Sequence, residues 1–284
     1  MNLSSMLHER AERGHPVRIA LIGCGKFATM YLTQALNTRG IQIVGIADLD
    51  PGRAMRQLAT AGWEAERYQA RDAAEALVNG TTWLTDDAAG LIAIDELDVV
   101  VEATGIPAAG ISHCRQAIAA GHHVVMVSVE ADVVAGPLLA KEARAAGVVY
   151  SLAWGDQPAL ICEHVDWART CGFNVVCAGK GTRYHPDYHA LTPDNVWDVL
   201  REYLEIDDPG SINLKMFNSF LDGSKSGIEM SAVCNATGLA PQSDGLNFPP
   251  CSRFELADVC KPAEDGGCLT ARGTTEVVSS LTRD

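Results

Sequence analysis

The sequence has no long hydrophobic run, no excess of positive charge and no closely paired cysteines. None of its apolar runs approaches the roughly 20 residues of a bilayer-spanning helix, and no signal-type apolar segment follows Arg10 and Arg13. The 22 Lys and Arg residues against 36 Asp and Glu give a net charge of −14, whereas nucleic-acid binding needs clustered cations. We therefore expect neither a membrane nor a nucleic acid as a partner.

The cysteines do not have the spacing of a disulfide framework or a zinc site. There are 9 of them, an odd number, with no C-x-x-C pair, and most lie within apolar stretches. This usage predicts reduced thiols and a cytoplasmic protein. Cys24 is interpreted as a small neutral spacer in preference to a reactive thiol at a helix start.

Length and composition predict a globular protein of two domains. The chain has 284 residues, and domains usually contain about 100–200. The hydrophobic fraction of 47% and the charged fraction of 20% are ordinary for such a protein. A polar loop at residues 155–158 predicts a boundary, with one domain over residues 1–155 and a second over residues 156–284.

A glycine-rich turn follows the first apolar run. Residues 17–22 have the length of a buried parallel strand, and the spacing G-x-G-x-x-A then leads into an apolar pattern of helical period. Such a turn leaves room for a dinucleotide pyrophosphate at the start of a helix, where backbone N–H groups favour an anion. The expected cofactor contacts are Gly23, Gly25, Lys26, Phe27 and Ala28.

The next expected strand, residues 41–47, ends in an acid. Asp48 stands where a dinucleotide-binding domain places the carboxylate that contacts the ribose, although it could instead cap the turn that follows. Arg53 is close enough in sequence to hold the 2′-phosphate of NADP(H). We therefore expect NADP(H), with NAD(H) left open.

Strands and helices continue to alternate through the first domain. A lead-in helix is expected at residues 1–12, a mostly helical segment at 52–80 and a further helix at 136–146. Three further strands are expected at residues 98–102, 121–128 and 147–152. This alternation predicts an α/β fold with a doubly wound parallel (Rossmann) sheet. Ala103, Thr104 and Gly105 are small enough to let a nicotinamide ribose approach, and Glu130 is expected to contact cofactor or substrate near a strand end.

The second half predicts a smaller α+β domain. A helix is expected at residues 159–170, a strand at 173–178 and a polar loop at 179–189. A second polar cluster at residues 218–229 opens into a helix, and the remainder is interpreted as loop-rich.

Several segments resemble known oxidoreductases. The first half resembles the nucleotide-binding domain of the homoserine dehydrogenase superfamily. The second half is similar to its deoxyxylulose-phosphate-reductoisomerase-like (DXR-like) relatives. The segments that carry the resemblance are residues 23–28, 98–105, 121–126, 129–132, 178–181, 222–225 and 235–239.

The resemblance implies NADPH-dependent conversion of 1-deoxy-D-xylulose 5-phosphate to 2-C-methyl-D-erythritol 4-phosphate, an early step of isoprenoid synthesis. Members of this family continue into a C-terminal SAF-type module, which we expect to be absent, leaving the second domain incomplete. Homoserine dehydrogenases carry an Asn-Lys pair where this chain has residues 128–130, so the alternative is a dehydrogenase of another homoserine-like or sugar-acid substrate. A nucleotide-sensing protein without chemistry is a third alternative.

The reaction needs a cationic binding site for the phosphate, an acid–base group, and stabilisation of the negative charge that develops on the substrate oxygen. Lys180 and Lys225 are expected to bind the polarised oxygens of the substrate. Arg183 or His185 is expected to bind its phosphate, although a position in a solvated loop explains these two residues equally well. Asp222 and Glu229 could share one pocket or a divalent cation, or Asp222 could only cap a turn. The expected catalytic residues are Lys180, Asp222, Lys225 and Glu229, and the expected substrate contacts are Arg183, His185, Asn218 and Ser224. A small phosphorylated substrate and a homo-oligomer are the expected partners.

Overall fold

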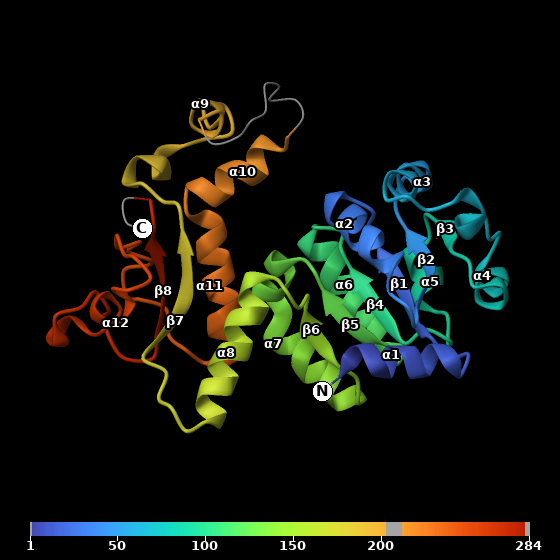
Figure 1. The fold of residues 1–284 in the computed structure, drawn as a ribbon, viewed down its shortest axis with the longest axis horizontal. Helices are drawn as coiled ribbons and strands as arrows, with labels where there is room; N and C mark the ends of the chain where they lie inside the picture. Colours follow the sequence, from blue (N-terminus) through green and yellow to red (C-terminus); the bar gives the residue numbers. More distant parts are fainter. Residues whose placement is uncertain (1, 203–211, 282–284) are drawn as a thin grey trace. The chain divides into compact units, whose positions relative to one another are not determined.

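The computed structural model describes residues 2–202 and 212–281, so Met1, the start of the expected lead-in helix, lies outside the described residues. The chain divides into two compact units, Met1–Trp154 and Gly155–Asp284 (Figure 1). Within the described residues, no helix combines the length and the apolarity needed to cross a membrane.

The first unit alternates strands and helices as the sequence predicts. Its elements are α1 (Leu3–Glu12), β1 (Val17–Ile22), α2 (Lys26–Ala35), β2 (Ile41–Ala47), α3 (Pro51–Thr60), the 3₁₀ turn η1 (Ala65–Tyr68), α4 (Ala73–Asn79), β3 (Trp83–Thr85), α5 (Ala88–Ile92), β4 (Val99–Glu102), α6 (Pro107–Ala119), β5 (His123–Met126), α7 (Val129–Ala146) and β6 (Tyr150–Leu152).

The strands of this unit form one parallel sheet in the order β3-β2-β1-β4-β5-β6. This is the predicted doubly wound Rossmann arrangement. Strand order reverses between β1 and β4, so the turns that follow these two strands meet at the switch point where such sheets bind ligands.

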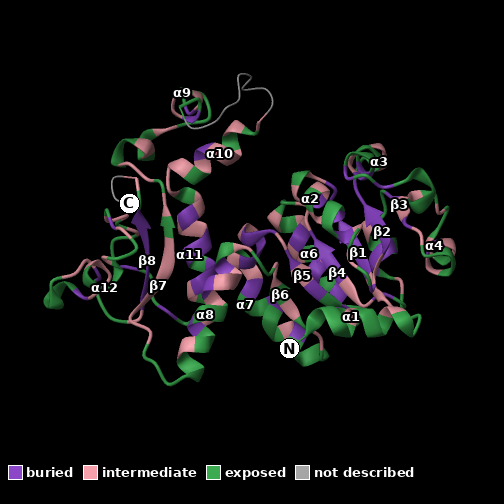
Figure 2. Cartoon of the chain, in the orientation of Figure 1, coloured by how far each residue is buried: buried purple, intermediate pink, exposed green. Residues whose placement is uncertain are grey.

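Side chains that alternate along the strands fill two cores. On one face, Leu21 of β1 packs with α2 and α3; on the other, Ile22 packs with α5, α6 and α7. Figure 2 shows the central strands buried and helix α1 exposed. Burial on both faces explains why these strands are continuous apolar runs in the sequence.

Helix α7 begins at Val129, earlier than the predicted residue 136. The side chain of Ser128 accepts a hydrogen bond from the backbone N–H of Ala131 at 3.3 Å and so caps the helix. Pro137 lies inside the helix without ending it. The predicted start at Gly136 was wrong, because the Ser128 cap upstream decides the boundary.

The second unit contains helices and one two-stranded sheet. Its elements are α8 (Gln157–Thr170), β7 (Cys177–Thr182), the 3₁₀ turn η2 (Pro186–Ala190), α9 (Trp197–Leu200), α10 (Leu214–Leu221), α11 (Ser224–Thr237), α12 (Leu256–Val259), the 3₁₀ turn η4 (Ala263–Asp265) and β8 (Thr274–Ser279). Helices α8 and α11 pack on one face of the β7–β8 sheet through Ile161, Val233 and Val277.

Strand β7 lies further along the chain than predicted. The prediction placed a strand at residues 173–178 and a loop at 179–189. In the structure the strand runs from Cys177 to Thr182 and so includes Gly179 and Lys180. The reason is pairing with β8, which falls in a region predicted to be loop: Gly179 lies opposite Glu276. A Cβ atom on Gly179 would lie 1.7 Å from the Glu276 carbonyl oxygen, so glycine permits the close approach.

The carboxyl group of Glu276 is buried, with 2% of the residue exposed, and fully hydrogen-bonded. It accepts from the backbone N–H groups of Asn247 (3.0 Å) and Val277 (2.9 Å). It also accepts from the side-chain amides of Gln242 (3.0 Å) and Asn247 (2.9 Å). These bonds fasten the loop that contains residues 242–247 to strand β8.

We predict that Gly179→Ala lowers the free energy of unfolding by about 2 kcal/mol or more, because the added methyl group overlaps the backbone of β8. Gly181→Ala is the matched control, since its Cβ would meet only Val278 Cγ2 at 3.9 Å. Urea-induced unfolding of both variants measures the difference. Equal stability of the two variants would contradict the close approach.

Candidate functional site

The turns after β1 and β4 contact each other. Gly23 has a φ of +91°, and a Cβ atom there would lie 2.7 Å from the Thr104 nitrogen and 2.8 Å from the Ala103 carbonyl. At Gly25 a Cβ atom would have no neighbour within 4 Å, and helix α2 begins at the next residue. The arrangement therefore leaves open space beside the helix N-terminus, which is what a pyrophosphate requires.

The other residues of the first turn have distinct environments. Lys26 is exposed, Phe27 stacks on Tyr31 with ring centroids 6.3 Å apart, and Ala28 is fully buried between helix and sheet. Burial, followed by the charge of Asp48, raises the pKa of the Cys24 thiol to about 11. Cys24 is therefore protonated at neutral pH, in keeping with the spacer interpretation.

Asp48 lies at the end of β2 with 5% of its surface exposed. Arg53 donates to both carboxylate oxygens at 2.7 Å, and the backbone N–H groups of Cys24 (2.7 Å) and Asp50 (2.9 Å) donate to them as well. Burial raises the pKa of Asp48, but these hydrogen bonds outweigh it and the net pKa is lowered. The Arg53 side chain stays 48% exposed, so its guanidinium is the outward-facing group here.

Glu102 is a buried acid beside these turns to which sequence reasoning gave no role. It is 0% exposed. Its Oε1 atom accepts from Thr104 Oγ1 at 2.6 Å and lies 3.4 Å from His113 Nδ1. Oε2 has no hydrogen-bond partner among the described residues. An acid within an apolar, β-branched strand was the signal that could have identified it.

Glu130 does not lie at a strand end as predicted. Strand β5 ends at Met126, and Glu130 lies in the first turn of α7, where a carboxylate interacts favourably with the helix dipole. Its place in the helix follows from the Ser128 cap.

In the second unit, Lys180 and Glu229 form a largely buried ion pair. Lys180 Nζ donates to Glu229 Oε2 and, at 2.6 Å, to Gln157 Oε1. The Lys180 and Glu229 side chains are 13% and 5% exposed. Strand β7 and helices α11 and α8 thus each supply one member of a polar cluster on the helix-covered face of the sheet.

Asp222 has a different set of partners. Its Oδ2 accepts from Asn218 Nδ2 at 2.7 Å and its Oδ1 from the Ser224 backbone N–H at 2.8 Å. Helix α11 begins at Ser224 with Gly223 at its N-cap, so the bond from the Ser224 N–H makes Asp222 part of an Asx-type turn before the helix. Asn218 is 6% exposed, and its Oδ1 has no hydrogen-bond partner among the described residues.

The remaining predicted residues are more exposed or serve local structure. Arg183 and Ser224 are exposed and Lys225 is half-buried on α11. His185 precedes η2, where its Nδ1 accepts from the Asp187 backbone N–H at 3.2 Å. Within residues 2–202 and 212–281, no cluster of His, Cys, Asp or Glu side chains suits a metal ion.

Cysteines distant in sequence meet at a cavity of about 540 Å³ in the second unit. Cys177, Cys251 and Cys260 line it together with Glu276. By strand alternation, Cys177 and Glu276 face away from the side where α8 and α11 pack. A hydrogen bond with Cys177 lowers the pKa of the Cys260 thiol, and the same contact raises that of Cys177. Sequence spacing gave no sign of this cluster.

Family models match both units of the chain. Residues 23–152 match the homoserine dehydrogenase NAD-binding domain, and residues 155–283 match the catalytic domain of oxidoreductase DRL. The class expected from the sequence, an oxidoreductase with a nicotinamide-nucleotide domain, is thereby confirmed. No curated protein matches the sequence.

Solved structures with remote similarity include an NAD-binding oxidoreductase from Klebsiella pneumoniae, at 21% identity and a TM-score of 0.41, over 62% of this chain and 44% of that one. Another is myo-inositol dehydrogenase from Lactobacillus casei in complex with NAD(H) and myo-inositol, at 10% identity and a TM-score of 0.43, over 61% of this chain and 48% of that one. The chain thus spans about half the length of these structures, or less.

We predict that iodoacetamide alkylates Cys260 faster than Cys268 at neutral pH, because the pKa of Cys260 is lowered whereas burial raises that of Cys268 to about 11. Cys177→Ala removes the hydrogen bond and slows alkylation of Cys260 several-fold. Cys171→Ala, at an exposed cysteine, is the control and leaves the rate unchanged. Peptide mass spectrometry over time follows each site, and an unaltered Cys260 rate in Cys177→Ala would contradict the assignment.

Proposed function

We propose that this chain is an NADP(H)-dependent oxidoreductase that acts on a small polar substrate at Lys180 and Glu229. The observation that carries the proposal is the buried ion pair of these residues, in a unit similar to an oxidoreductase catalytic domain. Holding an ion pair largely out of water costs desolvation free energy that packing alone does not require, which supports a chemical role for it.

The two residues have the chemistry that reduction of a carbonyl needs. An ammonium group has three N–H donors, and Lys180 uses two on Glu229 and Gln157, which leaves a third for a substrate oxygen. Lys180 would stabilise the developing alkoxide and give it a proton, and Glu229 would hold the lysine in position and share its charge. The nicotinamide group, when bound, supplies or accepts the hydride.

The residues of the first unit fit a dinucleotide. Gly25 borders open space at the start of α2, and Gly23 lets the two turns meet. The Asp48 oxygens are already engaged by Arg53 and two backbone N–H groups, which disfavours a ribose hydroxyl as their partner. The exposed guanidinium of Arg53 suits the 2′-phosphate of NADP(H).

Arg53→Gln is expected to raise KM for NADPH about tenfold and to change KM for NADH much less, because one charge-assisted contact with the 2′-phosphate is lost. The control is Arg56→Gln, one turn further along α3 and paired with Asp50 at 3.0 Å. Steady-state kinetics with both cofactors measure the ratio. An equal rise for both cofactors would point to disruption of the β2 end instead.

The finer proposal is reductive isomerisation of 1-deoxy-D-xylulose 5-phosphate, which rests on the resemblance of residues 178–181 and 222–225 to DXR-like oxidoreductases. A homoserine-like or sugar-acid substrate is the alternative dehydrogenase activity, and nucleotide sensing without turnover is the non-catalytic one. A panel of these substrates, monitored at the nicotinamide absorbance, separates the three. A homo-oligomer and a cytoplasmic location stay predictions.

For whichever substrate is turned over, Lys180→Ala is expected to lower kcat by about 100-fold or more, since the acid and its positive charge are lost together. Glu229→Gln lowers kcat less. Neither variant changes the affinity for NADPH, measured by fluorescence titration. Lys215→Ala, an exposed lysine on α10, serves as the control. Full activity in Lys180→Ala would remove the basis of the proposed site.

A further inference from the structure

A second cavity lies in the first unit, with a volume of about 400 Å³. It is bordered by the residues that precede or begin β1 and β2, including Pro16 and Gly40, and by Thr82 just before β3. The glycine turn and Asp48 follow the other ends of β1 and β2. A six-residue strand spans roughly 20 Å, so this cavity is separate from the proposed cofactor site.

The cavity carries positive charge in a strongly acidic chain. Arg39 and Arg67 line it, and none of its lining residues, all within the described part of the first unit, is Asp or Glu. The net charge of the chain is −14, so two arginines without a lining acid run against its overall charge. Guanidinium groups bind phosphate and carboxylate through paired N–H donors.

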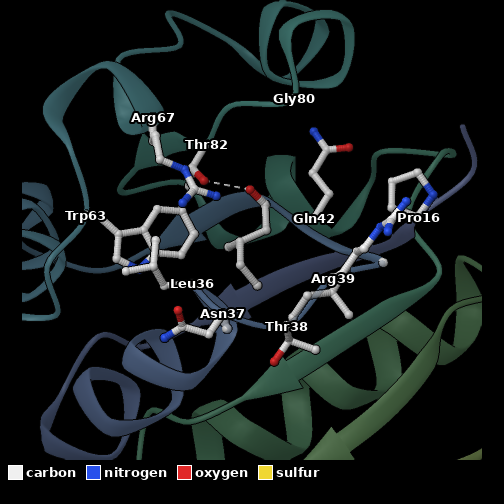
Figure 3. A pocket seen from close by; sticks show the side chains of 14 residues that line it. Pro16, Leu36, Asn37, Thr38, Arg39, Gln42, Trp63, Arg67, Gly80 and Thr82 are labelled. Atoms are coloured by element: carbon white, nitrogen blue, oxygen red, sulfur yellow. Dashed lines mark hydrogen bonds between the residues drawn. The ribbon is translucent and has the colours of Figure 1, made fainter. Parts of the chain in front are cut away.

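The two arginines face the hollow from different sides. In Figure 3, Arg67 lies on one side with Trp63 and Thr82, and Arg39 lies on the other with Pro16 and Gln42. The Arg67 guanidinium lies 4.5 Å from the centre of the Trp63 ring, which fixes its place while its N–H edges can still donate. The Arg39 ion pair with Glu12 is long, at 3.9 Å, and exposed, so it is weak and easily exchanged.

The walls are held by hydrogen bonds that do not use the arginine side chains. Trp63 Nε1 donates to the Leu32 carbonyl at 3.0 Å, and Thr82 Oγ1 donates to the Ile43 carbonyl at 2.7 Å. The Thr82 backbone N–H donates to the Arg67 carbonyl at 2.8 Å. The hollow is therefore preformed, which lowers the cost of ordering it around a ligand.

From this placement we propose that the cavity binds a small ligand with an anionic group at each end, of the sugar-bisphosphate class. One anionic group contacts Arg67 and the other contacts Arg39, with the ligand body beside apolar lining residues such as Leu36. Because open parallel sheets place catalytic sites at the carboxyl ends of strands, this ligand is an effector and not the substrate.

The test is isothermal titration calorimetry of the full chain, with NADPH present to fill the cofactor turn. Fructose 1,6-bisphosphate is the probe, and fructose 6-phosphate is the matched ligand with one phosphate. We expect the bisphosphate to bind about tenfold tighter or more. Arg39→Gln and Arg67→Gln each reduce its affinity to that of the monophosphate, and Arg71→Gln, an exposed arginine paired with Glu75, does not.

Equal affinity for the two sugars, or bisphosphate binding that survives both substitutions, would overturn the proposal. Modification of the unsubstituted protein by phenylglyoxal is a second measurement that needs no variant. Fructose 1,6-bisphosphate protects Arg39 and Arg67, but not Arg71, if the site is assigned correctly. All of these readouts are independent of catalytic activity.

Discussion

The largely buried ion pair between Lys180 and Glu229 constrains how the second unit can be built. Two charges removed from water are tolerated only while each stays close to the other and to further polar partners. Lys180 reaches Glu229 and Gln157 because β7 lies on β8. That pairing in turn depends on glycine at position 179, where no side chain fits. The close backbone approach at Gly179, on one face of the sheet, thus determines where the Lys180 ammonium group lies on the other face.

In the first unit, Asp48 organises the end of the sheet where the cofactor is proposed to bind. It joins the turn after β1, through the Cys24 backbone, to the start of α3, through Arg53. A carboxylate that fixes its neighbours in this way has little capacity left for a ligand. The acid predicted to contact the ribose therefore also supports the local structure, and the arginine is the group that faces outward.

Sequence patterns predicted the first unit well because its signals are local. Each buried strand is a continuous apolar run, and the glycine turn and the small residues Ala103 and Thr104 follow strands directly. The second unit depends on contacts between distant segments. The stretch Gly179–Lys180–Gly181 resembles a loop until β8 pairs with it, and Cys177 and Cys260 become neighbours only in the folded chain. For the same reason, Lys180 and Glu229 were identified as candidates singly, and the partners of Asp222, Asn218 and the Ser224 backbone, could not be assigned from the sequence.

Glu276 gives the second unit a property that its helices and strands alone would not provide. All of its hydrogen-bond donors named above are neutral, and two of the residues that supply them, Gln242 and Asn247, lie in the loop before α12. If that loop opened by itself, the buried carboxyl group would keep the Val277 backbone N–H but lose its donors from Gln242 and Asn247, at a large cost in free energy. Loop and strand therefore open together as one cooperative unit, so amide hydrogen exchange in both segments should report a single opening event.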